Sequence, residues 1–167
     1  MFSRFQGFAA GAFLAIGLLA PSARGDDDIK LSDVPKAVLD AVKAKFPGAE
    51  LTGAEKEVED DETVYEIALK HKGQEYDVSL TPAGKILEIE REIEIKDLPK
   101  AVTDALAKKY PGAKLEEAEE VTAGDKKTYE VEVVLADKKE LEVTLDAQGK
   151  ILETKAEDED DDDDEKK

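Results

Sequence analysis

The chain has 167 residues and contains no cysteine, no tryptophan, one histidine and one methionine. The missing cysteine excludes disulfides, thiolate metal sites and a cysteine nucleophile. A single histidine leaves little room for histidine-based catalysis or for a metal site built from several histidines. Cations are also scarce, with 24 Lys and Arg against 42 Asp and Glu, and the formal net charge is −18. This charge argues against a nucleic-acid partner, because such proteins bind phosphates with cations.

The first 25 residues have the layout of a secretory signal peptide. One cation, Arg4, precedes a mostly apolar and uncharged stretch from Gly7 to Ala20, which is too short for an ordinary membrane span. Ala23 and Gly25 are small residues at the spacing that signal peptidase requires, so we predict cleavage before Asp26. Cleavage after Ala23 and an uncleaved anchor helix are the alternatives. Export predicts a periplasmic or secreted protein without membrane attachment after cleavage.

The rest of the chain is a tandem repeat, recognisable from short motifs that recur. The matched motifs are PKAV at positions 35 and 99, FPGA and YPGA at 46 and 110, and GKILE at 84 and 149. The shift is 64 residues for the first two pairs and 65 for the third, so one residue is inserted in a turn between them. We therefore predict a signal peptide (1–25), two repeats (26–92 and 93–156) and a disordered acidic tail (157–167).

Each repeat is predicted to begin with one helix. Pro35 and Pro99 suit a first helical turn, and the prolines at 47 and 111 end the helix. The apolar residues between them recur at helical spacing. They are Val34, Val38, Ala41, Val42 and Phe46 in the first repeat, and Leu98, Val102, Ala105, Leu106 and Tyr110 in the second. Phe46 and Tyr110 are expected to fill the core at the helix end.

After each helix the apolar period changes to two, which is typical of half-buried strands. Apolar residues alternate with charged ones around Tyr65, Tyr76 and Leu87, and around Tyr129, Leu141 and Leu152. The pattern predicts an antiparallel meander of roughly four strands per repeat with one apolar face. A unit of about 64 residues is marginal alone. We therefore expect an α+β fold in which a long strand from Ile86 to Ile95 lets the repeats share a sheet or a core.

This pattern resembles the PepSY-like family, whose secreted or periplasmic domains are also described as β-lactamase-inhibitor-like. The resemblance rests on the Leu/Val-Pro-Lys-Ala-Val helix start, the aromatic-Pro-Gly-Ala helix end and the Gly-Lys-Ile-Leu-Glu strand, each present twice. It implies helices packed on one face of an antiparallel sheet. It also implies a non-enzymatic binding or inhibitory role, since related domains occur in protease propeptides. The resemblance carries over no catalytic residue.

The strongest candidate for a binding surface is the polar face of the predicted sheet. If Tyr65, Tyr76 and Leu87 point at the helices, the alternating carboxylates point away. The candidate face consists of Glu66, Glu75, Asp77, Glu88, Glu90, Glu130, Glu132, Glu140, Glu142 and Glu153. Such a face is either an ordinary solvated surface or a surface for a basic partner or divalent cations. Like charges on neighbouring strands cost stability, which makes so uniform a face unusual.

A second acidic feature is the run of nine acids from Glu157 to Glu165. Such a block repels itself and favours disorder, and it acts as a solubilising tail or binds calcium weakly. We find no nucleophile with a base, no phosphate-binding glycine loop and no metal motif, and His71 is expected to be a solvated turn residue. The sequence therefore predicts no enzyme and no cofactor. It predicts an exported binding module, in its sharpest form an inhibitor of an envelope or secreted hydrolase. The alternative is an acidic cation-binding or solvating envelope protein.

Overall fold

The structure is a computed structural model that describes residues 27–59 and 62–156. The predicted signal peptide and acidic tail, and the expected turn at positions 60 and 61, lie outside the described residues. The helices are α1 (Lys36–Lys45) and α2 (Lys100–Lys109), each preceded by a short 3₁₀ turn, Leu31–Asp33 or Ile95–Asp97. The strands are β1 (Asp27–Asp28), β2 (Glu50–Glu59), β3 (Glu62–His71), β4 (Gln74–Leu80), β5 (Ile86–Glu92), β6 (Lys114–Ala123), β7 (Lys126–Val134), β8 (Glu140–Asp146) and β9 (Ile151–Ala156).

The α+β class is confirmed by two helices and antiparallel strands that pair in chain order. The chain divides into two compact units. The N-terminal unit contains the described residues up to Glu92 together with Glu119–Lys127, which form the tip of the β6–β7 hairpin. The C-terminal unit contains Ile93–Ala118 and the described residues from Thr128 onward. The predicted repeat boundary at 92 and 93 stays a prediction.

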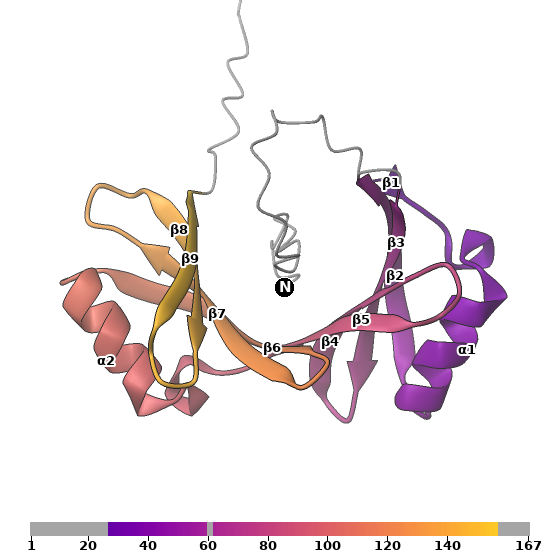
Figure 1. Ribbon diagram of the computed structural model, residues 1–167, viewed down its shortest axis with the longest axis horizontal. Coiled ribbons are helices and arrows are strands. Elements are labelled where there is room, and N and C mark those ends of the chain that lie inside the picture. The colour runs from indigo at the N-terminus through magenta and orange to yellow at the C-terminus, as the bar shows by residue number, and fades with distance from the viewer. Residues whose placement is uncertain (1–26, 60–61, 157–167) are drawn as a thin grey trace, which may run out of the picture. The chain divides into compact units, whose positions relative to one another are not determined.

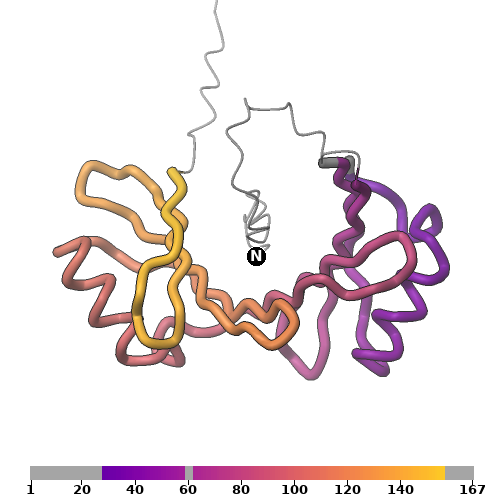
Figure 2. Tube along the Cα trace, in the orientation of Figure 1, coloured from indigo at the N-terminus to yellow at the C-terminus, as the bar shows by residue number. Residues whose placement is uncertain are grey.

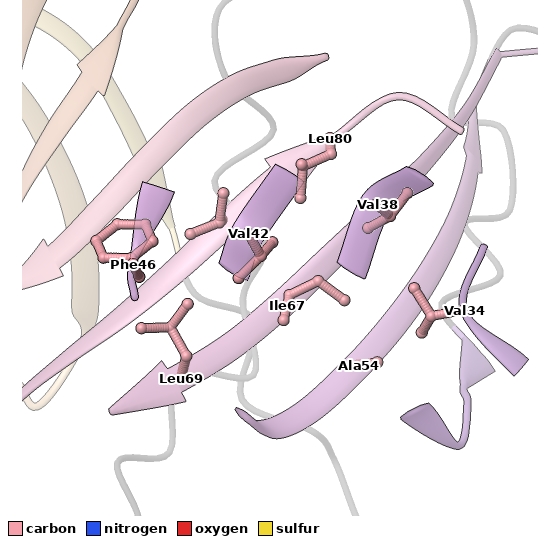
Figure 3. Packing of buried hydrophobic residues seen from close by; sticks show 9 residues of the cluster. Val34, Val38, Val42, Phe46, Ala54, Ile67, Leu69 and Leu80 are labelled. Atoms are coloured by element: carbon pink, nitrogen blue, oxygen red, sulfur yellow. The ribbon is translucent and has the colours of Figure 1, made fainter. Parts of the chain in front are cut away.

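In the N-terminal unit, α1 packs on one face of the strands (Figure 1). Val38 and Val42 are fully buried, since they lie one helical turn apart on the same side of α1. They meet Ile67 of β3 and other apolar strand residues, and Phe46 closes the helix end (Figure 3). Its ring lies 5.0 Å from that of Tyr76 and edge-on to that of His71, centroid to centroid 5.7 Å. His71 is therefore partly buried against Phe46, whereas a solvated turn residue was expected.

The C-terminal unit repeats this packing with α2. Val102 and Leu106 are buried, and they pack with Val131 of β7 and Val143 of β8. Tyr110 occupies the helix end but remains partly exposed, with its hydroxyl oxygen 3.4 Å from Oγ1 of Thr154. The buried apolar side chains of the two units thus form two clusters, each covered by its own helix.

Two expectations about the fifth strand were wrong. The strand ends at Glu92, and residues 95–97 form a 3₁₀ turn in which the N–H of Asp97 donates to the carbonyl of Glu94. The chain must leave the strand here, because Leu98 is buried at the entry to α2. Leu87 does not take the core position. A β-bulge after Ser79 pairs Leu80 with Ile86, so that Ile86 and Ile89 pack on the core instead.

Candidate functional site

The predicted carboxylates of the N-terminal unit lie on the sheet face away from α1. Ile67 and Val78 stand opposite each other in the core, so their strand neighbours Glu66 and Asp77 project from the other face. We call the set Glu66, Glu75, Asp77, Glu88 and Glu90 the N-terminal carboxylate face. Only Glu75 is exposed, and its carboxylate pairs with Lys70 at an Nζ–Oε1 distance of 2.6 Å. Glu88 is 8% exposed, and Glu66, Asp77 and Glu90 are partly buried.

The strand register sets like charges opposite each other on this face. Glu66 of β3 stands opposite Glu55 of β2, and Asp77 of β4 stands opposite Glu90 of β5. Burial, followed by the nearby carboxylates of Asp77, Glu55 and Glu119, raises the pKa of Glu66 to about 9. Burial and the Glu75 and Glu92 carboxylates raise the pKa of Asp77 to about 6. At neutral pH Glu66 is therefore mostly protonated.

Sequence reasoning missed three members of this surface. Glu55 and Glu57 lie on β2, and Glu57 is only 7% exposed. Their spacing of two along one strand could have indicated them. Glu119 belongs to β6 and reaches the N-terminal unit because β6 pairs with β5, Glu119 standing opposite Glu92. Figure 2 shows this hairpin tip alongside β5. No sequence signal indicated that contact, which depends on a non-local register.

The C-terminal unit carries the other five predicted carboxylates. We call Glu130, Glu132, Glu140, Glu142 and Glu153 the C-terminal carboxylate face. Glu132 stands opposite Glu142, which is 4% exposed. Glu130 is 6% exposed and accepts a hydrogen bond from Thr144 Oγ1 at 3.3 Å. Glu140 and Glu153 are exposed. Within each unit the structure therefore brings buried and exposed members of the predicted set to one face.

The two faces differ at one matched position. Lys155 of β9 stands opposite Glu142, and its Nζ donates to Oε1 of Glu142 at 3.1 Å. Burial opposes the charge on Lys155, but the carboxylates of Glu142 and Glu153 outweigh it and raise its pKa above the usual value. The 65-residue shift matches Glu142 with Asp77 and Lys155 with Glu90. The C-terminal unit thus places a lysine where the N-terminal unit places a glutamate.

Metal sites and membrane-spanning helices were also sought in the part of the chain that the structure describes. No group of three or more His, Asp or Glu side chains there is arranged to hold a metal ion. No helix among residues 27–59 and 62–156 has the length and apolar character of a membrane span. The Glu157–Glu165 run, the other suggested calcium ligand, lies outside the described residues.

Two segments of the chain match known protein families. Residues 74–153 match the family described as "Putative beta-lactamase-inhibitor-like, PepSY-like". Residues 35–90 match the family described as "Peptidase propeptide and YPEB domain". The resemblance to PepSY-like proteins is confirmed. Neither family description names a catalytic activity of the domain itself. No curated protein matches the chain.

Solved structures share the fold of this chain. A BLIP-like protein from Bacteroides fragilis is 22% identical, with a TM-score of 0.60, and the match covers 87% of this chain and 93% of that one. A Bacteroides eggerthii structure described as "putative periplasmic proteins" is 16% identical, with a TM-score of 0.62, and the match covers 74% of this chain and 88% of that one. At these identities the likeness shows the fold alone.

Proposed function

We propose that this protein is an exported, non-catalytic binding module whose N-terminal carboxylate face receives basic side chains of a protein partner in the cell envelope. The signal-peptide pattern supports export, and the description of the Bacteroides eggerthii relative supports the periplasm. The sharpest form of the proposal is inhibition of an envelope or secreted hydrolase. The family description and the BLIP-like relative support that form.

The observation that carries the proposal is the contrast between Lys155 and Glu90. In the C-terminal unit a lysine donates to a carboxylate that is 4% exposed. At the matched position of the N-terminal unit, Glu90 stands opposite Asp77 and adds negative charge. Like charges opposite each other destabilise a sheet by roughly 0.2–1 kcal/mol per pair. A lysine or arginine from a partner would offset that cost, just as Lys155 does in the C-terminal unit.

The chemistry of a matching partner follows from this geometry. An ammonium or guanidinium group that enters between Asp77 and Glu90 forms charge-assisted hydrogen bonds in a partly buried site. Its arrival favours the ionised form of Glu66, so binding should release protons. The negative charge of the whole chain speeds the encounter, and salt should slow it.

A fluorescence anisotropy titration tests the proposal with the chain from Asp26 to Lys167. The probe is a labelled peptide of alternating lysine and threonine. We expect Glu90→Lys to weaken binding at least tenfold at 0.15 M salt. Asp125→Lys makes the same change of net charge at an exposed turn and should weaken binding much less. Equal losses of affinity in the two variants would mean that peptide binding depends on the net charge of the chain and not on this face.

Inhibition is tested separately with purified secreted hydrolases, a β-lactamase included, and a chromogenic substrate. The inhibitor form predicts that one of them loses activity with the parent and keeps it with Glu90→Lys. A calcium titration of the same chain tests the alternative function. Saturable calcium binding that Glu90→Lys removes, without any peptide binding, would favour the cation-binding protein.

A further inference from the structure

Strand β9 has one edge with which no strand of the described residues pairs. In the hydrogen-bonded order of the described strands β9 comes last, and its neighbour is β8. Leu152, Glu153, Thr154 and Ala156 are exposed, Leu152 by 49%. An uncovered edge presents unpaired backbone groups to other chains, and proteins usually protect it with proline, charge or a covering segment. Here the strand contains no proline, its lysine pairs with Glu142, and Glu153 is its exposed charge.

The N-terminal unit shows what covers the matched strand. β5 and β9 share the GKILE motif and the same bulge, in which the extra residue belongs to the strand itself, Leu87 in β5 and Leu152 in β9. Yet β5 is paired on both sides, because residues 119–122 of β6 continue the sheet antiparallel to it. The same local sequence and register therefore support an interior strand in one unit and a terminal strand in the other.

Backbone directions on β9 follow from this match. The N–H of Ile93 donates to the carbonyl of Ala118, so by alternation Ile89 and Arg91 also face β6. The register of β9 on β8 repeats that of β5 on β4 with the 65-residue shift. Thr154 and Ala156, the counterparts of Ile89 and Arg91, therefore direct their N–H and C=O groups away from β8. The Thr154 side chain meanwhile lies near the Tyr110 hydroxyl.

We propose that the open edge of β9 binds an extended segment of the basic partner as an added antiparallel strand, paired with Thr154 and Ala156. This inference rests on the proposed function and states how the partner chain docks. Charge complementarity favours a partner strand over a second copy, because each copy has a formal charge of −18. Alternate residues of the added strand would lie beside the exposed carboxylate of Glu153, where lysine or arginine fits. This is the β-strand addition mode of peptide recognition.

The test uses the chain from Asp26 to Lys167, the labelled lysine–threonine peptide and two N-methylated forms of that peptide. Methylation of every second backbone nitrogen blocks one edge of the peptide, and the two forms block opposite edges. We expect one form to lose at least tenfold in affinity and the other to bind like the parent peptide. We also expect slower hydrogen exchange at the amides of Thr154 and Ala156 in the complex. Equal binding of both forms, or unchanged exchange, would overturn the inference.

A protein variant provides the matching control. Thr154→Pro removes an outward N–H without removing a bond to β8, and Thr154→Val keeps the N–H. Thr154→Pro should weaken binding at least tenfold and Thr154→Val should not. If Thr154→Pro fails to fold, the affinities of the two N-methylated peptides for the parent chain still test strand addition. Peptide binding that depends on Glu90 but not on Thr154 would overturn strand addition and leave the proposed function standing, whereas no peptide binding would end both. Self-association in sedimentation that Thr154→Pro abolishes would identify a second copy as the occupant, against the inference.

Discussion

Lys155 Nζ lies 3.1 Å from Oε1 of Glu142, and the matched pair in the other unit is Glu90 opposite Asp77. One face therefore has a lysine opposite its carboxylate at this position, while the other has a glutamate. The pKa of Asp77 is raised to about 6, first by burial and then by the carboxylates of Glu75 and Glu92. This difference between two otherwise similar units is the basis of the proposed function and of the first prediction.

Glu90→Lys should stabilise the free protein above pH 6. The new lysine stands opposite Asp77 in the same register as Lys155 opposite Glu142, and it replaces a repulsion by an attraction. We expect a gain of about 1 kcal/mol in the free energy of unfolding, measured by urea denaturation at pH 7.5. Asp125→Lys is the control for net charge. A gain no larger than that of the control would show that the pair contributes nothing local.

Stability should fall as the pH rises from about 5 to 9. Glu66 keeps its proton to a pKa of about 9 in the folded chain, against 4.5 as its ordinary value. The folded state therefore binds more protons than the unfolded state in this window, and the free energy of unfolding decreases with pH. Urea denaturation at pH 5 and 8.5 should show that Glu66→Gln removes more than about 1.4 kcal/mol of this loss, the equivalent of one pKa unit. Parallel pH profiles for parent and variant would contradict the placement of Glu66.

Gly84→Ala and Gly149→Ala should each destabilise the chain strongly. Each glycine has a positive φ, and a Cβ would lie 2.5 Å from the Ala37 carbonyl oxygen in one unit and 2.2 Å from that of Ala101 in the other. Gly48→Ala is the matched control, because Gly48 has φ +82° and open space around it. The control should cost about 1–2 kcal/mol for the left-handed backbone alone. Thermal unfolding should show larger losses at 84 and 149, and equal losses would mean that these turns do not press on the helices.

Phe46→Ala should cost roughly 3–5 kcal/mol, since the ring is 7% exposed and contacts the rings of His71 and Tyr76. Val58→Ala provides a control at a side chain that is 50% exposed, where about 0.5 kcal/mol or less is expected. Chemical denaturation measures both. A loss below about 1 kcal/mol for Phe46→Ala would place this ring outside the core.

Much of the fold could be predicted because its signals are local. Helical spacing identified Val38 and Val42 as core residues, and alternation placed Glu66 and Asp77 on the opposite face of the sheet. The position of Leu87 could not be predicted, because a bulge changes the phase of alternation without leaving a mark in the pattern. The role of Glu119 depends on how β6 registers against β5, which is a non-local property.

The burial of the predicted carboxylates also could not be predicted from the sequence. Alternation states which face a side chain occupies but not how deeply it lies. Glu88, Glu130 and Glu142 are all buried, whereas Glu75, Glu140 and Glu153, with the same pattern, are exposed. The contrast between Glu90 and Lys155 was present in the aligned repeats. Its meaning emerged only from the register, which places both opposite a carboxylate.

Proton release on binding tests the central claim most directly. The lysine–threonine peptide is titrated into the chain from Asp26 to Lys167 at pH 7.5, in buffers with different heats of ionisation. If a basic side chain enters the N-terminal carboxylate face, Glu66 loses its proton, and the binding heat should change with the buffer by a sizeable fraction of a proton per complex. Glu66→Gln should abolish this dependence. A binding heat that is the same in every buffer, with the parent chain saturated by the peptide, would contradict the account.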